Sequence, residues 1–387
     1  MTAPCLRAAL TAILLATAST GTAMLVLATP AQAQSVRAVV GKPLNEAKAL
    51  VAAKNWKAAM AKVNEAEAAP NKTPAENQII AQMKQYIAVQ SGDVSIGGVV
   101  AAKAKFARDY NDRKFKDVIA DGEILRKFNA LDANSMQVIA QAYYQAGDKA
   151  GCEKYIKSNF GNNAGDSTLE LLMRCAYENG DEATQRQALE TLVAHTGKPE
   201  FWNDLLKISE HAQGMRDPDT LDIYRIKMVT GTLAGKDDYT LLAQLALQLG
   251  YPAEAVSVLE KGQAAKILTD ERTTKLLALA KSQAGTDAAN QPKAIAAAKA
   301  APSGDALIKI GTDQIGQGNA KDAIATIQDG LAKPVKDKND GLIRLGMAYY
   351  YAGQKDQAVK TFNEVKSSTP NDKTAMIAHL WSLAAHH

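Results

Sequence analysis

Glycines recur at nearly constant intervals along most of this sequence. They are Gly147, Gly180, Gly214, Gly250, Gly285, Gly318 and Gly353, with successive gaps of 33, 34, 36, 35, 33 and 35 residues. Glycine readily adopts the left-handed conformation that ends many helices, because it has no Cβ atom. Asp148, Asp181 and Asn319 each follow such a glycine, where a side-chain oxygen can cap the next helix. The glycine series therefore predicts a row of helix pairs, each turning at a glycine.

Apolar residues flank these turns at spacings of three and four, which is typical of one buried helix face. The clearest unit has apolar, small and aromatic positions at Leu342, Leu345, Gly346, Tyr349, Ala358, Phe362 and Val365, and it closes at Pro370. This unit resembles a tetratricopeptide repeat, a helix–turn–helix of about 34 residues with small, aromatic and proline positions at these spacings. The unit around Gly285 matches less well, since Pro292 interrupts its second helix.

The resemblance implies an all-α fold, a right-handed α-solenoid of antiparallel helix pairs. Composition agrees, because the chain is rich in alanine and lacks the alternating β-branched runs of strands. The predicted organisation has four parts: a signal peptide over 1–33, irregular helical repeats over 34–132, a tetratricopeptide-like array over 133–372, and a capping helix with a tail over 373–387. In that last helix Trp381 is expected to pack against the final repeat.

The region before the array is less regular. Helices are expected at 44–53, 56–68, 73–90, 99–110 and 115–128, the last two joined by a turn at Asn111 and Asp112. Residues 91–98 contain three glycines and shift the repeat register. We therefore hypothesise a hinge or a subdomain boundary in this segment.

The N-terminal segment has the pattern of an export signal. Arg7 precedes an uncharged, apolar or small stretch over 8–28, and Ala31-Gln32-Ala33 is a small-x-small cleavage site. Cleavage would start the mature chain near Gln34 and place it in the periplasm or outside the cell, whereas a retained anchor is the alternative. No second apolar run follows, so no membrane insertion is expected after cleavage. The near-neutral charge, +4 overall, gives no reason to expect nucleic acid.

Two cysteines remain after the predicted cleavage, Cys152 and Cys175. An oxidising compartment permits a disulfide, and the two residues fall on helices that would be neighbours in the stack. The alternative is a pair of buried thiols that act as small apolar side chains. Both interpretations stay open at the level of sequence.

No catalytic pattern survives inspection. The chain has no HExxH, GxSxG, Walker-type or GxGxxG motif, and its five histidines have no zinc spacing. The acidic pair around Pro218 is typical of a helix start, and His386-His387 is typical of a solvated tail. The sequence thus predicts a protein that is not an enzyme and that needs neither cofactor nor metal.

What remains is the concave surface formed by the first helices of the repeats. Counting back from each glycine turn, the candidate groove residues are Gln137, Gln141, Tyr144, Arg174, Tyr177, Gln244, Gln248, Met347 and Tyr350. Glutamine and tyrosine form hydrogen bonds and stacking contacts without a charged partner. The carboxylate clamp of peptide-binding repeats would need a basic set, of which only Arg174 and Lys275 stand at comparable positions. We expect a scaffold for a protein or peptide partner in the cell envelope. The alternative is a periplasmic component of a transport system that binds a small molecule or a lipid.

Overall fold

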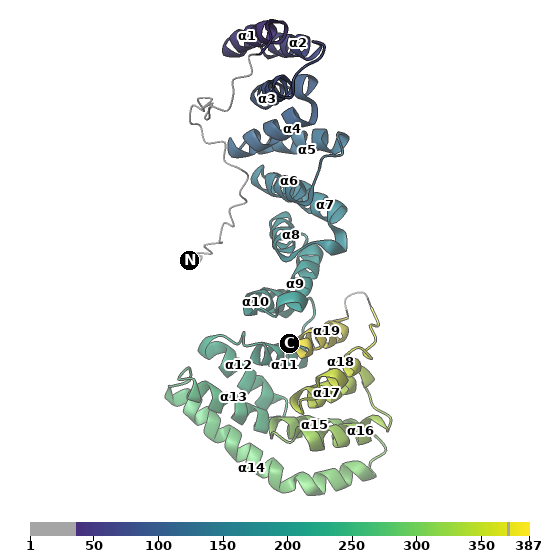
Figure 1. Ribbon diagram of the computed structural model, residues 1–387. Coiled ribbons are helices and arrows are strands. Elements are labelled where there is room, and N and C mark those ends of the chain that lie inside the picture. The colour runs from purple at the N-terminus through teal and green to yellow at the C-terminus, as the bar shows by residue number, and fades with distance from the viewer. Residues whose placement is uncertain (1–35, 370–371) are drawn as a thin grey trace. The chain divides into compact units, whose positions relative to one another are not determined.

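The computed structural model describes residues 36–369 and 372–387, and this part of the chain is all-α, without strands (Figure 1). The predicted signal peptide lies outside the described residues. The chain divides into two compact units, Met1–Asn163 and Ala164–His387. This division falls within the array expected over 133–372, and the four-part organisation stays a prediction.

Unit 1 is a row of helices, each packed against the next. They are α1 (Ala38–Ala52), α2 (Trp56–Glu67), α3 (Pro74–Ser91), α4 (Val94–Asn111), α5 (Phe115–Lys127), α6 (Ala133–Gln145), α7 (Lys149–Asn159) and the short 3-10 helix η1 (Gly161–Asn163). Apolar positions at helical spacing make the contacts, as where Val40 and Leu44 of α1 join Ala59 and Val63 of α2 in one core. The five helices expected before residue 132 are therefore present, with shifted ends.

The glycine segment at 91–98 is mostly helical, not an extended break. Helix α3 ends at Gly92, whose φ is 62°, and Asp93 caps α4 at once. A kink at Gly98, with φ 54°, interrupts the first turns of α4. Gly97 sits where an added Cβ would lie 2.5 Å from the Cβ of Ala88, so only glycine lets α4 approach α3 this closely. The hinge proposed from sequence thus corresponds to one kinked helical turn.

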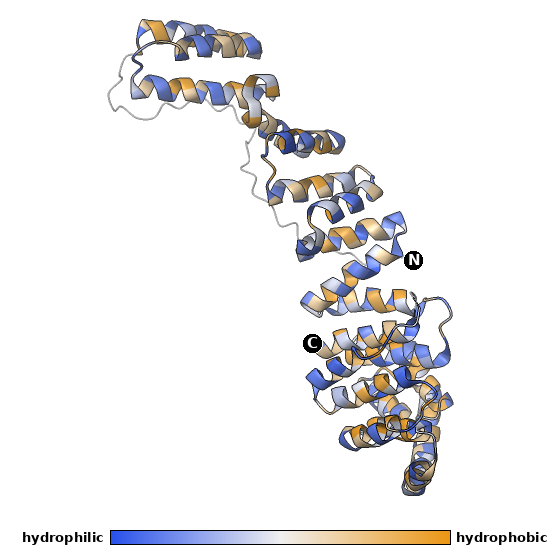
Figure 2. Ribbon diagram, turned by 90° about the vertical axis from the view of Figure 1, so that its right-hand side faces the viewer, coloured by the Kyte–Doolittle hydropathy of each residue, from blue (hydrophilic) through white to orange (hydrophobic). Residues whose placement is uncertain are grey.

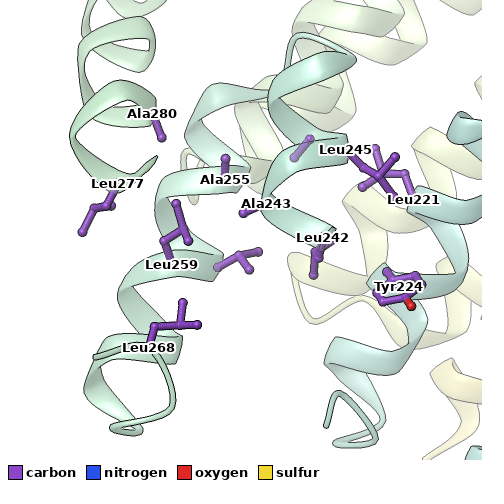
Figure 3. Packing of buried hydrophobic residues seen from close by; sticks show 12 residues of the cluster. Leu221, Tyr224, Leu242, Ala243, Leu245, Ala255, Leu259, Leu268, Leu277 and Ala280 are labelled. Atoms are coloured by element: carbon purple, nitrogen blue, oxygen red, sulfur yellow. The ribbon is translucent and has the colours of Figure 1, made fainter. Parts of the chain in front are cut away.

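Unit 2 holds the remaining helices. They are α8 (Asp166–Asn179), α9 (Glu182–Thr196), α10 (Pro199–Glu210), α11 (Asp217–Val229), α12 (Gly235–Gln248), α13 (Pro252–Ala264), α14 (Glu271–Ala300), α15 (Asp305–Gly316), α16 (Ala320–Leu331), α17 (Lys338–Tyr351), α18 (Lys355–Phe362) and α19 (Lys373–His386). Hydrophobic and hydrophilic residues alternate along these helices (Figure 2). One core cluster joins Leu221 of α11, Leu242 of α12, Leu259 of α13 and Leu277 of α14 (Figure 3). Burial of such faces, more than local propensity, stabilises the helices.

Six of the seven predicted glycine turns are confirmed. Their φ values lie between 76° and 83°, as at Gly147 (83°) and Gly353 (76°). The turn predicted at Gly285 is wrong, because this glycine lies inside α14, a continuous helix of 30 residues. Alanines on both sides favour the helix there, and Pro292, which is exposed, removes one hydrogen bond without breaking it. Asn319 precedes α16 but makes no side-chain cap, unlike Asp148 and Asp181.

The last helix does more than cover the final repeat. Helix α19 packs on α17 and α18, as expected, and also contacts α9 and α11, which lie far earlier in the chain. Trp381 is fully buried and stacks on Phe362 of α18 at 5.9 Å between ring centroids. Unit 2 therefore closes on itself, and its helices do not contact sequence neighbours alone. Among the described helices, none is both long and apolar enough to cross a bilayer.

Candidate functional site

The closure of unit 2 encloses a charged cavity of about 440 Å³ between α11, α15, α17 and α19. Helix α11 supplies Asp219, Asp222 and Arg225 to this wall, and α17 supplies Asp340 and Arg344. The start of α11 is fixed by Asp219, whose carboxylate accepts a hydrogen bond from the backbone N–H of Arg216 at 3.0 Å. The acidic pair around Pro218 therefore acts as a helix start, as the sequence indicated.

The floor of the charged cavity is a buried ion network. Arg344 of α17 donates from Nη2 to Oδ2 of Asp222 at 2.8 Å, although the two residues are 122 positions apart. Arg225 donates from Nη1 to Oδ1 of Asp222 at 2.7 Å and reaches Glu254 of α13 with two further bonds, of 2.8 and 2.6 Å. Arg344 also donates to Asp340 at 2.6 Å. The network joins three helices through groups that are each hydrogen-bonded.

Electrostatics keeps this floor ionised. Burial by itself would raise the pKa of Asp222, but the Arg344 and Arg225 guanidinium groups outweigh it and lower the pKa below its ordinary value. Burial likewise opposes the charge of Arg225, whereas Glu254 and Asp222 raise its pKa. A carboxylate held by two guanidinium groups in this way is a poor proton acceptor. Asp222 thus has a positioning role between α11 and α17.

The rim of the charged cavity carries groups of a different kind. Lys309 of α15 and Lys336, in the loop before α17, are exposed, and neither joins an ion pair within the part of the chain that the structure describes. The rim acids are engaged by contrast: Asp305 accepts from Ser303 at 2.8 Å and from the Lys336 backbone at 3.0 Å, and Asp337 caps α17. The ammonium groups are therefore the charges left available to an incoming partner.

Histidine and carboxylate side chains of unit 2 form pairs, and no metal-binding cluster occurs among the described residues. Over residues 36–369 and 372–387, no cluster of three His, Cys, Asp or Glu side chains could hold a metal ion. His379 and His195 each face one carboxylate, Glu190 at 3.5 Å and Asp166 at 2.9 Å, in unit 2. His387 contacts the carbonyl oxygen of Val193 at 2.8 Å, so this tail residue is bonded as well as exposed.

The groove residues predicted from sequence fall on four helices, and none lines the charged cavity. Gln137, Gln141 and Tyr144 are half-buried on α6 of unit 1, where the Lys149 ammonium lies 3.3 Å from the Tyr144 ring centroid. Arg174 and Tyr177 are exposed on α8, and Gln244 and Gln248 are exposed on α12. Gln248 donates to Asp217 at 2.6 Å. Their role in binding stays a prediction.

One of the predicted positions, Met347, needs correction, and Tyr350 beside it is partly covered. Met347 was expected on an open surface, yet its side chain is only 2% exposed. Tyr350 is half-buried, and its ring lies 5.6 Å from that of Trp381. The reason is the closure of unit 2, which covers this face of α17. Conversely, the sequence analysis missed Asp222, Arg225 and Arg344, which are buried. The signal that could have revealed them is a charged residue at a position where the helical period predicts a buried one.

Lys275 and the two cysteines were also singled out in the sequence. Lys275, one of two residues considered for a carboxylate clamp, pairs with Glu271 at 2.7 Å on the exposed start of α14. Cys152 lies in α7 of unit 1 and Cys175 in α8 of unit 2, and both are fully buried. Their pairing stays a prediction.

Comparison with known proteins gives one family match. Residues 340–372, which include most of α17 and all of α18, match the tetratricopeptide repeat model. The chain carries a tetratricopeptide repeat. This confirms the interpretation of residues 342–370, and the helix pairs before it make the chain a helical repeat protein of tetratricopeptide-like type. No curated protein sequence matches the chain significantly.

Two solved structures share a general likeness. A chain of the structure of Naa15/Naa10 bound to HypK-THB is 15% identical over 87% of this chain and 59% of its own length, with a TM-score of 0.32. A chain of the APC/C hetero-tetramer Cut9-Hcn1 is 12% identical over 84% of this chain and 66% of its own length, with a TM-score of 0.22. This chain thus spans about three fifths of the first relative. Scores this low support no argument about function.

Proposed function

We propose that this protein is a non-enzymatic scaffold that binds a protein or peptide partner through the charged cavity of unit 2. The observation that carries the proposal is the contrast between floor and rim. The floor is an ion network that holds α11 and α17 in place, whereas Lys309 and Lys336 at the rim have no ion-pair partner among the described residues.

The chemistry of the rim favours one kind of partner. Two available ammonium groups beside a polar cavity suit the carboxylates of an acidic segment, whose charge-assisted hydrogen bonds are stronger than neutral ones. The cavity wall includes aliphatic residues such as Ile308 and Ile343, but the ionised groups of Asp222, Arg225 and Arg344 beside them do not suit a lipid, which needs an apolar enclosure. The pairing of Asp222 with two guanidinium groups, which makes it a poor proton acceptor, supports binding over catalysis.

A charge reversal with a matched control tests the proposal. Lys336→Glu places a carboxylate at the rim, whereas Lys338→Glu changes another exposed lysine, which does not line the cavity. Affinity capture with the wild-type chain should retain a partner that Lys338→Glu also retains and that Lys336→Glu loses. If all three proteins capture the same partners in equal amount, the charged cavity is not the binding site.

We also propose that this binding takes place in the periplasm. The support is the sequence pattern alone, with Arg7, the uncharged stretch over 8–28 and the cleavage site before Gln34. Fractionation and N-terminal sequencing of the native protein test this point. A mature chain that starts near Gln34 in the periplasmic fraction is expected, and an intact N-terminus in the cytoplasm would contradict it.

A further inference from the structure

Helix α14 is anchored at both ends and stands clear of the core between them. At its start Leu277 and Ala280 pack into the core cluster (Figure 3). At its end Ala298 is buried, and Lys333 donates to the carbonyl oxygens of Lys299 and Ala301 at 2.6 and 2.7 Å. From Lys281 to Ala297 no residue of the helix is buried. Contacts at the two ends hold this exposed stretch beside α15 (Figure 1).

The space between α14 and α15 forms a hollow of about 500 Å³, which we name the α14 groove. Its walls include Ala294, Ala297 and Ala301 on one side and Ala306, Ile310 and Asp313 on the other. Side chains this small let the backbone of a bound segment approach closely. The groove is therefore shaped for a chain with modest apolar side chains.

A buried carboxylate interrupts this apolar lining. Asp313 is 9% exposed, and its Oδ2 accepts one hydrogen bond, from Gln317 at 2.8 Å. Its Oδ1 is buried without a hydrogen bond of normal geometry among the described residues, although the backbone N–H of Ala253 on α13 lies near enough to the carboxylate to favour its charge. Burial raises the pKa of Asp313, and the nearby carboxylate of Asp287 on α14 raises it further. Lys309, one turn earlier on α15, forms no ion pair with Asp313, and its Nζ lies beside Gly250 instead.

A buried carboxylate without a cationic partner destabilises a folded protein. We propose that the α14 groove docks a segment of a partner protein that inserts a lysine or arginine side chain towards Asp313. The cation supplies the missing countercharge, Asp287 adds attraction at the entrance, and the alanines contact the rest of the segment. Lys309 lines both the α14 groove and the charged cavity, but the proposal uses the carboxylate of Asp313, which lines only the groove, so it does not depend on the proposed function.

Site-specific photo-cross-linking tests the occupant in the full-length chain. The photoreactive residue p-benzoylphenylalanine replaces Ala294, which lines the groove, and in the control it replaces Ala296, which is exposed on α14 but outside the groove. Cells that make the protein should yield a polypeptide cross-linked from position 294 only, with a lysine or arginine beside the cross-linked residue. A segment without a basic residue, or equal cross-linking from both positions, overturns the proposal.

The captured segment, made as a synthetic peptide, tests the role of the carboxylate. Asp313→Asn keeps the hydrogen bond to Gln317 and removes the charge, and it should weaken peptide binding about tenfold or more. Replacing the basic residue of the peptide with norleucine should cause the same loss with the wild-type protein and no added loss with Asp313→Asn. Losses that add in full would show that the two side chains do not meet, which overturns the proposal.

Stability of the free protein gives an independent readout. Because Asp313→Asn removes a buried charge that has no cationic partner, the melting temperature of the variant should rise by about 2–4 °C. A purely structural Asp313 predicts a fall instead, and a fall contradicts the proposal. Methylammonium provides the last arm: if it stabilises the wild-type chain and no polypeptide cross-links from position 294, the site binds a small amine and docking is excluded.

Discussion

At the residue scale, the repeat pattern continues towards the N-terminus beyond the first turn glycine, Gly147. Arg113 ends the turn between α4 and α5 with a φ of 59°, and it lies 34 residues before Gly147 (147 − 113 = 34). It therefore occupies the turn position of one more repeat in the same register. A non-glycine residue in this conformation carries a cost of about 1–2 kcal/mol. Lys54, with φ 57°, stands in the same kind of turn between α1 and α2.

Arg113→Gly should stabilise the protein. The change relieves the left-handed strain and adds some entropy to the unfolded chain, so the net gain should be about 0.5–1 kcal/mol in the free energy of unfolding. Urea denaturation followed by circular dichroism measures it. Lys116→Gly, an exposed position within α5, is the control and should lose about 1 kcal/mol. A loss for both variants would contradict the assignment of Arg113 to a repeat turn.

The turn residues show how far the sequence alone could predict the repeat. Glycine turns were visible because few other residues favour the left-handed region. Arg113 was hidden, because an arginine stands at this turn where the later turns have glycine. Gly285 gave a false signal because its neighbours, mostly alanine, favour a helix through it. The spacing of about 34 residues therefore identified the repeat. The presence of glycine at that spacing did not identify every turn.

At the scale of elements, contacts between distant helices decide the candidate site. Asp222 and Arg344 meet across 122 residues, and no local pattern could pair them. The same closure buries Met347, which an open solenoid would expose. The sequence therefore predicted most of the helices and their order, although not the single long helix α14, whereas the cavity depends on how α17 and α19 return to α11. Whether α17 and α19 come back to α11 depends on the sum of the packing angles between successive helices. The spacing of residues in the sequence does not reveal these angles.

Asp222→Ala should destabilise unit 2 strongly. The change leaves two buried guanidinium groups with one carboxylate partner each, and such losses cost about 3–5 kcal/mol. Chemical denaturation monitored by tryptophan fluorescence, to which Trp381 contributes, is the measurement. Asp329→Ala is the control, since this exposed acid pairs with Lys299 on the surface and should change stability by less than about 1 kcal/mol. Equal effects of the two variants would show that the network is not holding α11 to α17.

The packing of α19 on α9 should depend on pH. His379 Nε2 lies 3.5 Å from Oε2 of Glu190, whose hydrogen bond raises the pKa of the histidine above its ordinary value while burial opposes the rise. This stabilisation is complete below the unfolded-state pKa of about 6.5 and is lost as pH rises through the folded-state pKa. Since the side chain is half exposed, the effect should be below about 1 kcal/mol.

Melting temperatures at pH 6 and pH 8.5 measure this dependence. The wild type should lose more stability between the two values than Glu190→Gln or His379→Asn, and the double variant should behave like either single one. Additive effects of the two substitutions would contradict a direct interaction between the side chains.

At the scale of the whole chain, the two units are built differently. In unit 1 the helices pack mainly on their neighbours in sequence, so stability should be the sum of local contributions, as in other repeat arrays. Unit 2 adds contacts between α19 and the earlier helices α9 and α11. Because these contacts need the last helix in place, unit 2 should unfold more cooperatively than unit 1.

The predicted disulfide concerns the whole chain, since Cys152 belongs to unit 1 and Cys175 to unit 2. Both side chains are fully buried, which suits either a disulfide or two apolar thiols. A bond that closes a loop of this length should stabilise the oxidised protein by about 3 kcal/mol. Peptide mapping without reductant should yield one linked pair of peptides that contain these cysteines.

Substitution distinguishes the two states through additivity. If the cysteines are bonded, Cys152→Ala and Cys175→Ala each remove the same bond, so the double variant should be no less stable than the less stable single one. If they are separate thiols, the losses should add and reductant should leave the melting temperature of the wild type unchanged. Export would favour the first result, because an oxidising compartment lets buried cysteine pairs persist as disulfides.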